Sequence, residues 1–110
     1  MDIQLKRGVL EVCVLAVLRR GESYGYRLVR DVSDVIPMTE STLYPILKRL
    51  ESGGLVTVRS AEHNGRLRKY YRITEAGNLR ISEFVKEWKE LMRVYSAIES
   101  EIGGHDREEG

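Results

Sequence analysis

The C-terminal third of the sequence carries an apolar repeat that one isolated helix cannot bury. Its large apolar residues alternate spacings of three and four over about three heptads, as the a and d positions of a coiled coil do. The repeat consists of Ile81, Phe84, Trp88, Leu91, Tyr95, Ile98 and Ile102. We expect a long helix that packs against a second copy of the chain, and hence a homodimer. Packing of this helix against the rest of the same chain is the alternative.

Charge is distributed unevenly along the 110 residues. Residues 1–80 contain 14 Lys and Arg against 9 Asp and Glu, whereas residues 81–110 contain 4 against 8. This polarity indicates a basic body that could meet a polyanion and an acidic C-terminal segment that would not. A solvated surface with uneven charges is the plainer interpretation.

The first half of the chain predicts three helices. Residues 5–20 are apolar on most sides, so this helix should be covered on more than one face. Ser23 is expected to cap the second helix, and Thr39 the third. Gly53 and Gly54 then end the third helix. Two short helices joined by a short connection have the layout of a helix-turn-helix.

A β-hairpin is predicted directly after the third helix. Residues 55–60 and 66–74 are rich in β-branched and aromatic residues, and the turn dipeptide Asn64-Gly65 lies between them. Tyr71 is expected to be a packed strand residue. The loop and the second strand carry several cations, with only Glu62 nearby. Such a hairpin after a helix-turn-helix is typical of a wing.

Three stretches carry a resemblance to a known family. SYGYRLV, LYPILKRLESGGLV and GRLRKYYRITEAG, together with the long C-terminal helix, resemble the PadR family of transcriptional regulators, in its short-tailed subfamily. The resemblance runs from about residue 9 to residue 95. It implies a winged helix-turn-helix, a homodimer built through the terminal helix, and repression from an operator with two-fold symmetry.

The fold class expected on these grounds is mainly α with a small β-hairpin. We assign residues 1–75 to a winged helix-turn-helix DNA-binding domain, 76–102 to a dimerisation helix and 103–110 to a flexible acidic tail. The sequence departs mildly from the family pattern. Tyr24 stands where many relatives have a small residue or His, and Gly53 replaces a commonly charged position.

Candidate DNA contacts fall on the third helix and on the wing. A recognition helix places its N-terminal residues at base edges, and a later lysine can reach a phosphate. Alternatively, Ser41 and Thr42 satisfy early helix amides and Tyr44 packs internally. Arginine on a wing suits a narrow, electronegative minor groove. The candidates on the helix are Ser41, Thr42, Tyr44 and Lys48. The candidates on the wing are Asn64, Gly65, Arg66, Arg68, Lys69 and Arg72.

The resemblance also implies a ligand pocket between subunits. Some multidrug-binding relatives have a tryptophan at the place that matches Trp88, where flat aromatic ligands stack. A hydrophobic anchor in a dry seam is the alternative for Trp88. The residues expected to line such a pocket are Val12, Leu15, Trp88 and Met92. A small planar ligand bound there would release the operator.

Enzymatic and metal-dependent functions have no motif in the sequence. There is no phosphate-binding glycine loop, no Ser/His/Asp signature and no Cys/His cluster. The apolar run around Cys13 is too short to span a bilayer, and no signal-peptide pattern precedes it. We therefore expect a soluble, cytoplasmic protein that is not an enzyme, has no cofactor and no metal, and binds double-stranded DNA.

One other class of function stays open. A winged helix can also serve as a protein–protein interaction module that applies its hairpin to a protein partner. The cations of the wing favour DNA, because a protein-binding wing would more often expose an apolar patch.

Overall fold

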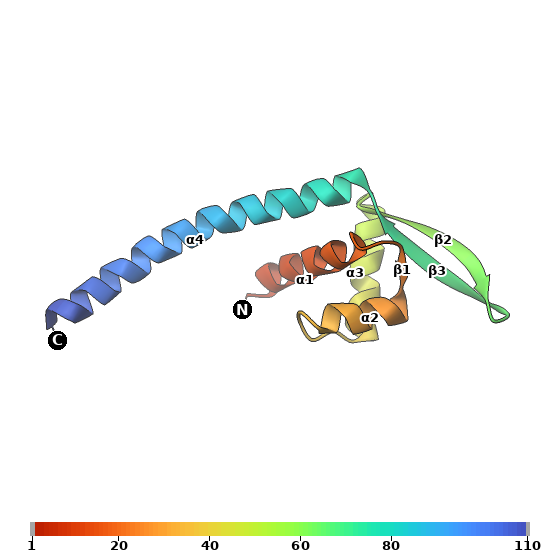
Figure 1. The fold of residues 1–110 in the computed structure, drawn as a ribbon, viewed down its shortest axis with the longest axis horizontal. Coiled ribbons are helices and arrows are strands. Elements are labelled where there is room, and N and C mark those ends of the chain that lie inside the picture. The colour runs from red at the N-terminus through yellow and green to blue at the C-terminus, as the bar shows by residue number, and fades with distance from the viewer. Residues whose placement is uncertain (1, 110) are drawn as a thin grey trace.

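The computed structural model describes residues 2–109, and side-chain environments up to residue 103 (Figure 1). The fold is mainly helical with a small antiparallel sheet, which confirms the expected class. The elements are α1 (Ile3–Leu18), β1 (Ser23–Tyr24), α2 (Gly25–Ser33), α3 (Glu40–Ser52), β2 (Val56–His63), β3 (Arg66–Ile73) and α4 (Glu75–Glu109).

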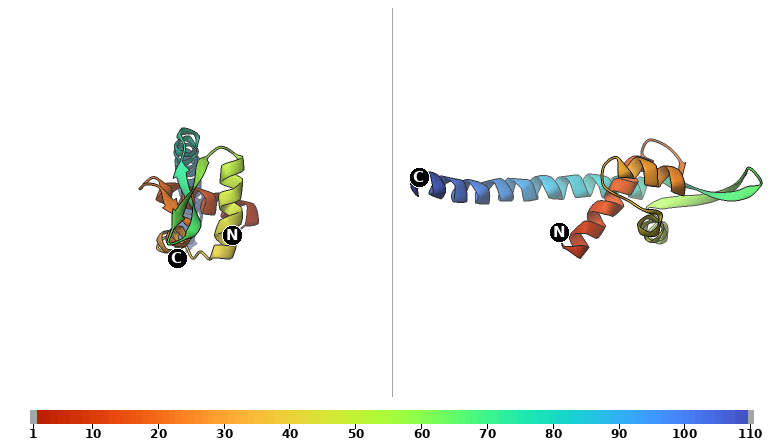
Figure 2. Two further views of the ribbon diagram at one scale, coloured as in Figure 1. Left: turned by 90° about the vertical axis from the view of Figure 1, so that its right-hand side faces the viewer. Right: turned by 90° about the horizontal axis from the view of Figure 1, so that it is seen from below.

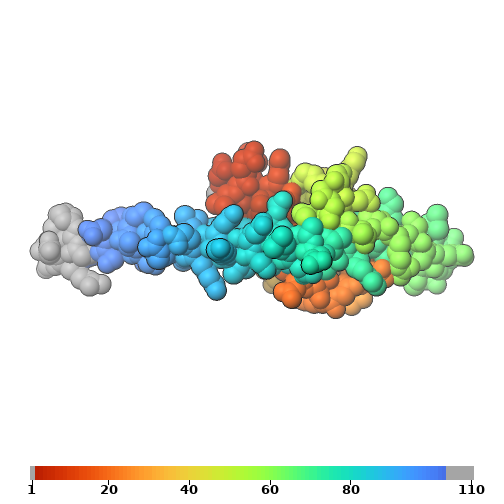
Figure 3. Space-filling model, turned by 90° about the horizontal axis from the view of Figure 1, so that it is seen from above, coloured from red at the N-terminus to blue at the C-terminus, as the bar shows by residue number. Residues whose placement is uncertain are grey.

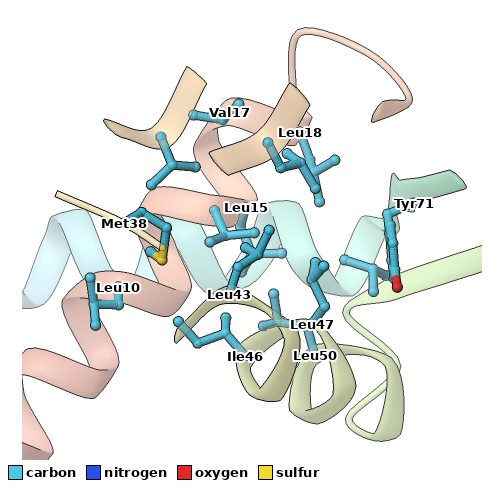
Figure 4. Close-up of a cluster of buried hydrophobic side chains, with 14 residues drawn as sticks. Leu10, Leu15, Val17, Leu18, Met38, Leu43, Ile46, Leu47, Leu50 and Tyr71 are labelled. Atoms are coloured by element: carbon cyan, nitrogen blue, oxygen red, sulfur yellow. The ribbon is translucent and has the colours of Figure 1, made fainter. Parts of the chain in front are cut away.

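The first three helices pack around one hydrophobic core (Figure 4). Leu15 of α1, Leu28 of α2 and Leu43 of α3 are fully buried at its centre. Val56 and Tyr71 extend the core onto the sheet, so the expectation that Tyr71 packs inside is confirmed. The core therefore joins the helix-turn-helix and the base of the hairpin into one rigid unit.

Local interactions fix both ends of α3. The Thr39 hydroxyl accepts a hydrogen bond from the Thr42 amide at 3.4 Å, as expected of an N-cap. At the other end the Leu55 amide donates to the Leu50 carbonyl at 2.9 Å while Gly54 adopts φ +73°, which is a Schellman motif. Pro45 lies inside the helix, but the carbonyl that it leaves without a donor belongs to exposed Ser41 and stays open to water.

The hairpin closes with a two-residue turn. Asn64 and Gly65 have φ values of 50° and 78°, as a type I′ turn requires. His63 pairs directly with Arg66. The first strand thus runs three residues beyond its expected end at residue 60, because so short a turn leaves residues 61–63 free to pair.

A third strand, β1, was not expected from the sequence. Ser23 pairs with Tyr71 and Tyr24 pairs with Tyr70, which gives the sheet order β1-β3-β2. The prediction that Ser23 caps the second helix is wrong, because Ser23 is buried against the sheet and Tyr24 takes the cap position without a side-chain hydrogen bond. This strand ties the start of α2 to the base of the wing.

The last helix dominates the shape of the molecule. α4 contains 35 residues, and the structure measures 69 × 25 × 22 Å. The hairpin and the end of α4 project in opposite directions from the helical body (Figures 2 and 3). The helix also continues through Gly103 and beyond the expected boundary at 102. A glycine inside a helix costs about 1 kcal/mol relative to alanine but does not block the backbone hydrogen bonds.

Candidate nucleic-acid interface

α3 divides its residues between the core and the solvent. Its apolar residues at helical spacing are buried, whereas the four predicted DNA contacts are exposed. The hydroxyls of Ser41 and Thr42 each lie 3.1 Å from the Thr39 hydroxyl at the start of the helix. These two side chains thus belong to the capping cluster and still face solvent. The buried set is Leu43, Ile46, Leu47 and Leu50.

Tyr44 lies across the start of α2. A Cβ atom at Gly25 would lie 2.5 Å from the Tyr44 hydroxyl, so only glycine allows the phenol ring to approach so closely. The side chain nevertheless keeps 48% of its surface exposed. Tyr44 is therefore partly packed and partly accessible, so it combines the two alternatives of internal packing and an exposed DNA contact.

Strand alternation separates the wing residues into two faces. Tyr71 points into the core, so Lys69 and Leu67 share its face farther along β3. Leu67 is 81% exposed. Arg68 and Arg72 lie on the opposite, outer face of the hairpin. The predicted wing cations therefore do not form one continuous patch.

A stack of aromatic rings and guanidinium groups covers the outer face. The guanidinium carbon of Arg68 lies 3.9 Å from the centroid of the Tyr24 ring. The rings of Tyr24 and Tyr70 pack edge to face, with their centroids 6.0 Å apart. On the other side, the guanidinium carbon of Arg59 lies 4.6 Å from the centroid of the Tyr70 ring. Glu22 accepts two hydrogen bonds from Arg59, at 2.6 and 2.8 Å, and this pairing lowers the pKa of the Glu22 carboxyl. The stack links all three strands and holds the wing in one orientation.

Arg72 lies at the base of the hairpin rather than at its tip. It borders a shallow depression of about 270 Å³ together with Glu22, Arg59 and Tyr70. It lies six positions after Arg66, which is about 20 Å along an extended strand. The structure thus separates Arg72 from the other wing candidates.

A groove lies beside the wing, and we call it the wing groove. It has a volume of about 490 Å³ and brings Tyr44 together with the wing candidates Asn64, Arg66, Arg68 and Lys69. Of the predicted DNA contacts, it does not include Ser41, Thr42, Lys48, Gly65 or Arg72. Its lining residues are Tyr24, Gly25, Tyr26, Tyr44, His63, Asn64, Arg66, Leu67, Arg68, Lys69 and Tyr71.

Several residues that line the wing groove were not predicted as DNA contacts, among them two tyrosines and a leucine. Tyr24 and Tyr26 come from the junction of β1 with α2, and Leu67 comes from the wing. In the sequence, the two tyrosines belong to the motif SYGY, which pointed only to the family resemblance and not to a DNA contact. Tyr44 approaches Gly25 closely, and the tyrosines on either side of this glycine also border the groove.

Burial changes the acidity of one tyrosine at the bottom of this groove. Desolvation raises the pKa of the Tyr71 hydroxyl above its ordinary value, and the neighbouring Tyr44 and Glu51 raise it further. Tyr71 therefore stays neutral at physiological pH and acts as a packed ring with a hydroxyl, not as an anion.

A second groove lies between α1 and α4. Its volume is about 450 Å³, and it is bordered by Val12 and Trp88, two of the residues predicted to line a ligand pocket between subunits. Trp88 packs against Phe84 with the ring centroids 5.8 Å apart. The prediction that Leu15 lines this pocket is wrong, because Leu15 faces the helical core and is fully buried. Met92 is not among the residues that border the groove and lies exposed farther along α4.

The heptad seam of α4 is half covered and half open within one chain. Ile81 packs against the core, and Phe84 and Trp88 are partly buried. Leu91 is 49% exposed and Ile98 is 55% exposed, and the remaining seam residues Tyr95 and Ile102 are similarly open. An apolar stripe therefore continues along α4 beyond the N-terminal end of α1.

The described residues contain neither a membrane-spanning helix nor a metal-binding cluster. No helix there is long and apolar enough to cross a membrane. Over the same residues no three His, Cys, Asp or Glu side chains gather in a way that could hold a metal ion.

Comparison with known proteins finds close similarities. Residues 14–83 match the Transcriptional regulator PadR-like family. A transcriptional regulator from Mycobacterium tuberculosis is 29% identical over 103 residues, which cover 93% of this chain and 96% of that protein. The crystal structure of a PadR family transcriptional regulator from Eggerthella lenta is 37% identical with a TM-score of 0.77, over 87% of this chain and 86% of that one. Bacillus subtilis PadR, solved in complex with operator DNA, is 27% identical with a TM-score of 0.65, over 70% of this chain and 46% of that chain.

Proposed function

The chain belongs to the transcriptional regulator PadR-like family, and from this premise we propose that it is a homodimeric repressor that binds an inverted-repeat operator. Membership of this family makes the protein a transcriptional regulator and not an enzyme. The observation that carries the proposal is the wing groove, where the exposed Tyr44 of α3 and three wing cations meet. Bacillus subtilis PadR, a structural relative, was solved with operator DNA, and this supports DNA as the partner.

The proposed contacts divide by element. Ser41 and Thr42, at the N-terminal end of α3, would read base edges in the major groove, and Lys48 would reach a phosphate. Asn64, Gly65 and Arg66 form the tip of the wing and would enter the adjacent minor groove. Lys69 would meet the DNA backbone. Arg68 and Arg72 would contribute through wing orientation and long-range charge, since the first stacks on Tyr24 and the second lies near Glu22.

Dimerisation is proposed through α4. The exposed stripe from Leu91 to Ile102 is an apolar surface that a second copy of the same helix would cover. Residues 1–75 would then act as the DNA-binding unit, and two such units would meet successive major grooves roughly 34–36 Å apart. An operator with two-fold symmetry follows from a two-fold dimer.

A planar effector is proposed for the groove between α1 and α4. Trp88 and Phe84 supply aromatic surface there, and Val12 supplies an aliphatic wall. We expect a planar aromatic cation such as ethidium to quench the fluorescence of Trp88, the single tryptophan. Saturable quenching at micromolar ligand, together with weaker operator binding, would support release by the ligand. A linear, unsaturable response like that of free tryptophan would argue for a dry seam.

Arg66 is expected to contribute mainly through its charge. Replacing Arg66 with alanine should weaken binding to all duplexes and lower the slope of log K against log salt by about 0.9, because one phosphate contact is lost. The measurement is fluorescence anisotropy between about 50 and 200 mM salt. A loss confined to one base pair of the operator, with the slope unchanged, would instead show that Arg66 reads a base.

The experiment that tests the proposed function is selection from a random duplex pool. Sequences bound by the purified protein are recovered and re-measured by anisotropy across salt. Enrichment of an inverted repeat bound by two protomers, with a steep salt slope, would support the dimeric regulator. Weak binding without an enriched sequence would favour the protein-interaction module that the wing could also serve.

A further inference from the structure

Glu22 places a carboxylate on a unit whose proposed partner is a polyanion. It lies against the outer face of the hairpin, beside Arg59 and Arg72. A negative charge repels DNA, so long-range electrostatics alone would make Glu22 unfavourable for the proposed function. The contacts of this side chain indicate a different role.

Glu22 and Arg59 form an ion pair with a defined geometry. Nε of Arg59 donates to one carboxylate oxygen at 2.8 Å, and a terminal nitrogen donates to the other at 2.6 Å. Such a bidentate pair fixes the direction of both side chains, which a single contact would not do. The Glu22 side chain keeps only 20% of its surface exposed, whereas the Arg59 side chain keeps 57%. The better packed carboxylate therefore orients the more exposed arginine.

This pair joins the helical body to the strand that lies farthest from β1. Glu22 directly precedes β1, in the link that follows α1, whereas Arg59 belongs to β2. β3 lies between these two strands, so β1 and β2 share no hydrogen bonds. The guanidinium of Arg59 lies over the ring of Tyr70 in β3 and bridges the gap. Of the ion pairs in the part of the chain with described side chains, it alone involves the hairpin.

The position of the wing tip depends on how the base of the hairpin is held. The hairpin projects from the helical body (Figure 1), and β1 pairs with β3 only at Tyr70 and Tyr71. Arg59 pairs with Tyr70, and His63 lies four positions farther along β2, which is about 13 Å along an extended strand. Two strands without a third neighbour are only marginally stable on their own. A change of angle at the base would therefore displace the tip.

On the basis of the proposed function, we propose that Glu22 is a positioning residue that holds the wing, through Arg59, at the angle that operator binding requires. Its carboxylate then strengthens operator binding although its charge repels phosphate. The gain comes from preorganisation, because a wing already at the correct angle loses less conformational freedom when α3 and the wing tip engage DNA together. Arg59 acts through its contacts with Glu22 and Tyr70 and does not need to touch DNA.

Removing the Glu22 charge separates positioning from long-range electrostatics, because the two predict changes of opposite sign. Glu22→Gln keeps the size of the side chain and should weaken binding to the selected operator about fivefold in fluorescence anisotropy. The matched control is Glu62→Gln, which removes a hairpin carboxylate that none of the ion pairs among the described residues includes. It should bind as tightly as the native protein or more tightly. Native or tighter binding by Glu22→Gln would overturn the proposal.

The melting temperature shows whether the loss reflects unfolding. Both variants should melt close to the native protein, because an exposed ion pair contributes little to the free energy of unfolding.

Exchanging the two charges tests the pair itself. Glu22→Arg breaks the pair and makes the chain more positive by two charges, and the added change Arg59→Glu restores both the net charge and a pair of opposite charges. Positioning predicts that the double variant binds the operator more tightly than Glu22→Arg alone. Long-range electrostatics predicts the reverse order, since the single variant is the more positive. Observing that reverse order would count decisively against the proposal.

A double-variant cycle with Arg66 shows whether the effect passes through the wing. The loss caused by Arg66→Ala should be at least about threefold smaller in the Glu22→Gln background than in the native protein, because a displaced tip no longer brings Arg66 to DNA. Independent sites would instead give losses that combine to within about twofold, and this outcome would refute the positioning role while operator binding itself persists. Failure of the native protein to bind any duplex would instead refute the proposed function.

Discussion

Replacing Leu91 with aspartate should convert the proposed dimer to a monomer and weaken operator binding at least about 100-fold, because two linked half-site contacts become one. Leu91 lies in the exposed half of the heptad seam. In a dimer, two carboxylates would be buried in an apolar interface, and each buried charge costs several kcal/mol. Within one chain the same side chain is 49% exposed, so the fold should tolerate the change.

A control variant separates this effect from the added charge. Ser96→Asp adds the same charge to the same helix, at an exposed position outside the heptad seam. Sedimentation equilibrium should show a monomer for Leu91→Asp and a dimer for Ser96→Asp, with circular dichroism unchanged in both. A dimer with full operator affinity in Leu91→Asp would place the subunit contact elsewhere than on α4.

The elements that the sequence predicted well are those with local causes. Thr39 at the start of α3, the Gly53-Gly54 stop and the Asn64-Gly65 turn each act within a few residues, and the structure has all three. Predictions from local patterns failed where pairing with a residue far away in the sequence determines the structure. Serine is a common helix-capping residue, but Ser23 pairs with Tyr71 of β3 and therefore lies in a strand.

The candidate site was predictable in part for the same reason. Helical spacing identified the exposed residues of α3, but it could not tell which side of α1 faces the core, so Leu15 was wrongly assigned to a pocket. The wing cations were visible in the sequence, whereas their division between two faces depends on strand register. The contribution of Tyr26 and Leu67 to the wing groove depends on the packing of α2 beside the hairpin, which no local pattern encodes.

Replacing Gly77 with alanine adds a single methyl group but should markedly lower the free energy of unfolding. Gly77 is buried in the first turn of α4, where an added Cβ would overlap the Leu55 carbonyl oxygen and lie 2.6 Å from Cγ1 of Ile73. The carbonyl cannot move freely, because it accepts the Thr74 amide at 3.0 Å. The Thr74 hydroxyl in turn donates to the Gly54 carbonyl at 2.7 Å and accepts from the Gly77 amide at 3.1 Å. The change would therefore strain the junction of α3, the hairpin and α4.

The expected cost is a net loss of about 2 kcal/mol in the free energy of unfolding, because overpacking of 1–3 kcal/mol or more outweighs the gain of about 1 kcal/mol in helix propensity. For a chain of this size this lowers the melting temperature by roughly 10 °C. Gly103→Ala provides the matched control, because it lies in the same helix and its added Cβ would meet nothing within 4 Å. That variant should be neutral or more stable by up to about 1 kcal/mol. Equal melting temperatures for the two variants would mean that the junction yields to the added methyl group, and α4 would then not be held rigidly on the DNA-binding unit.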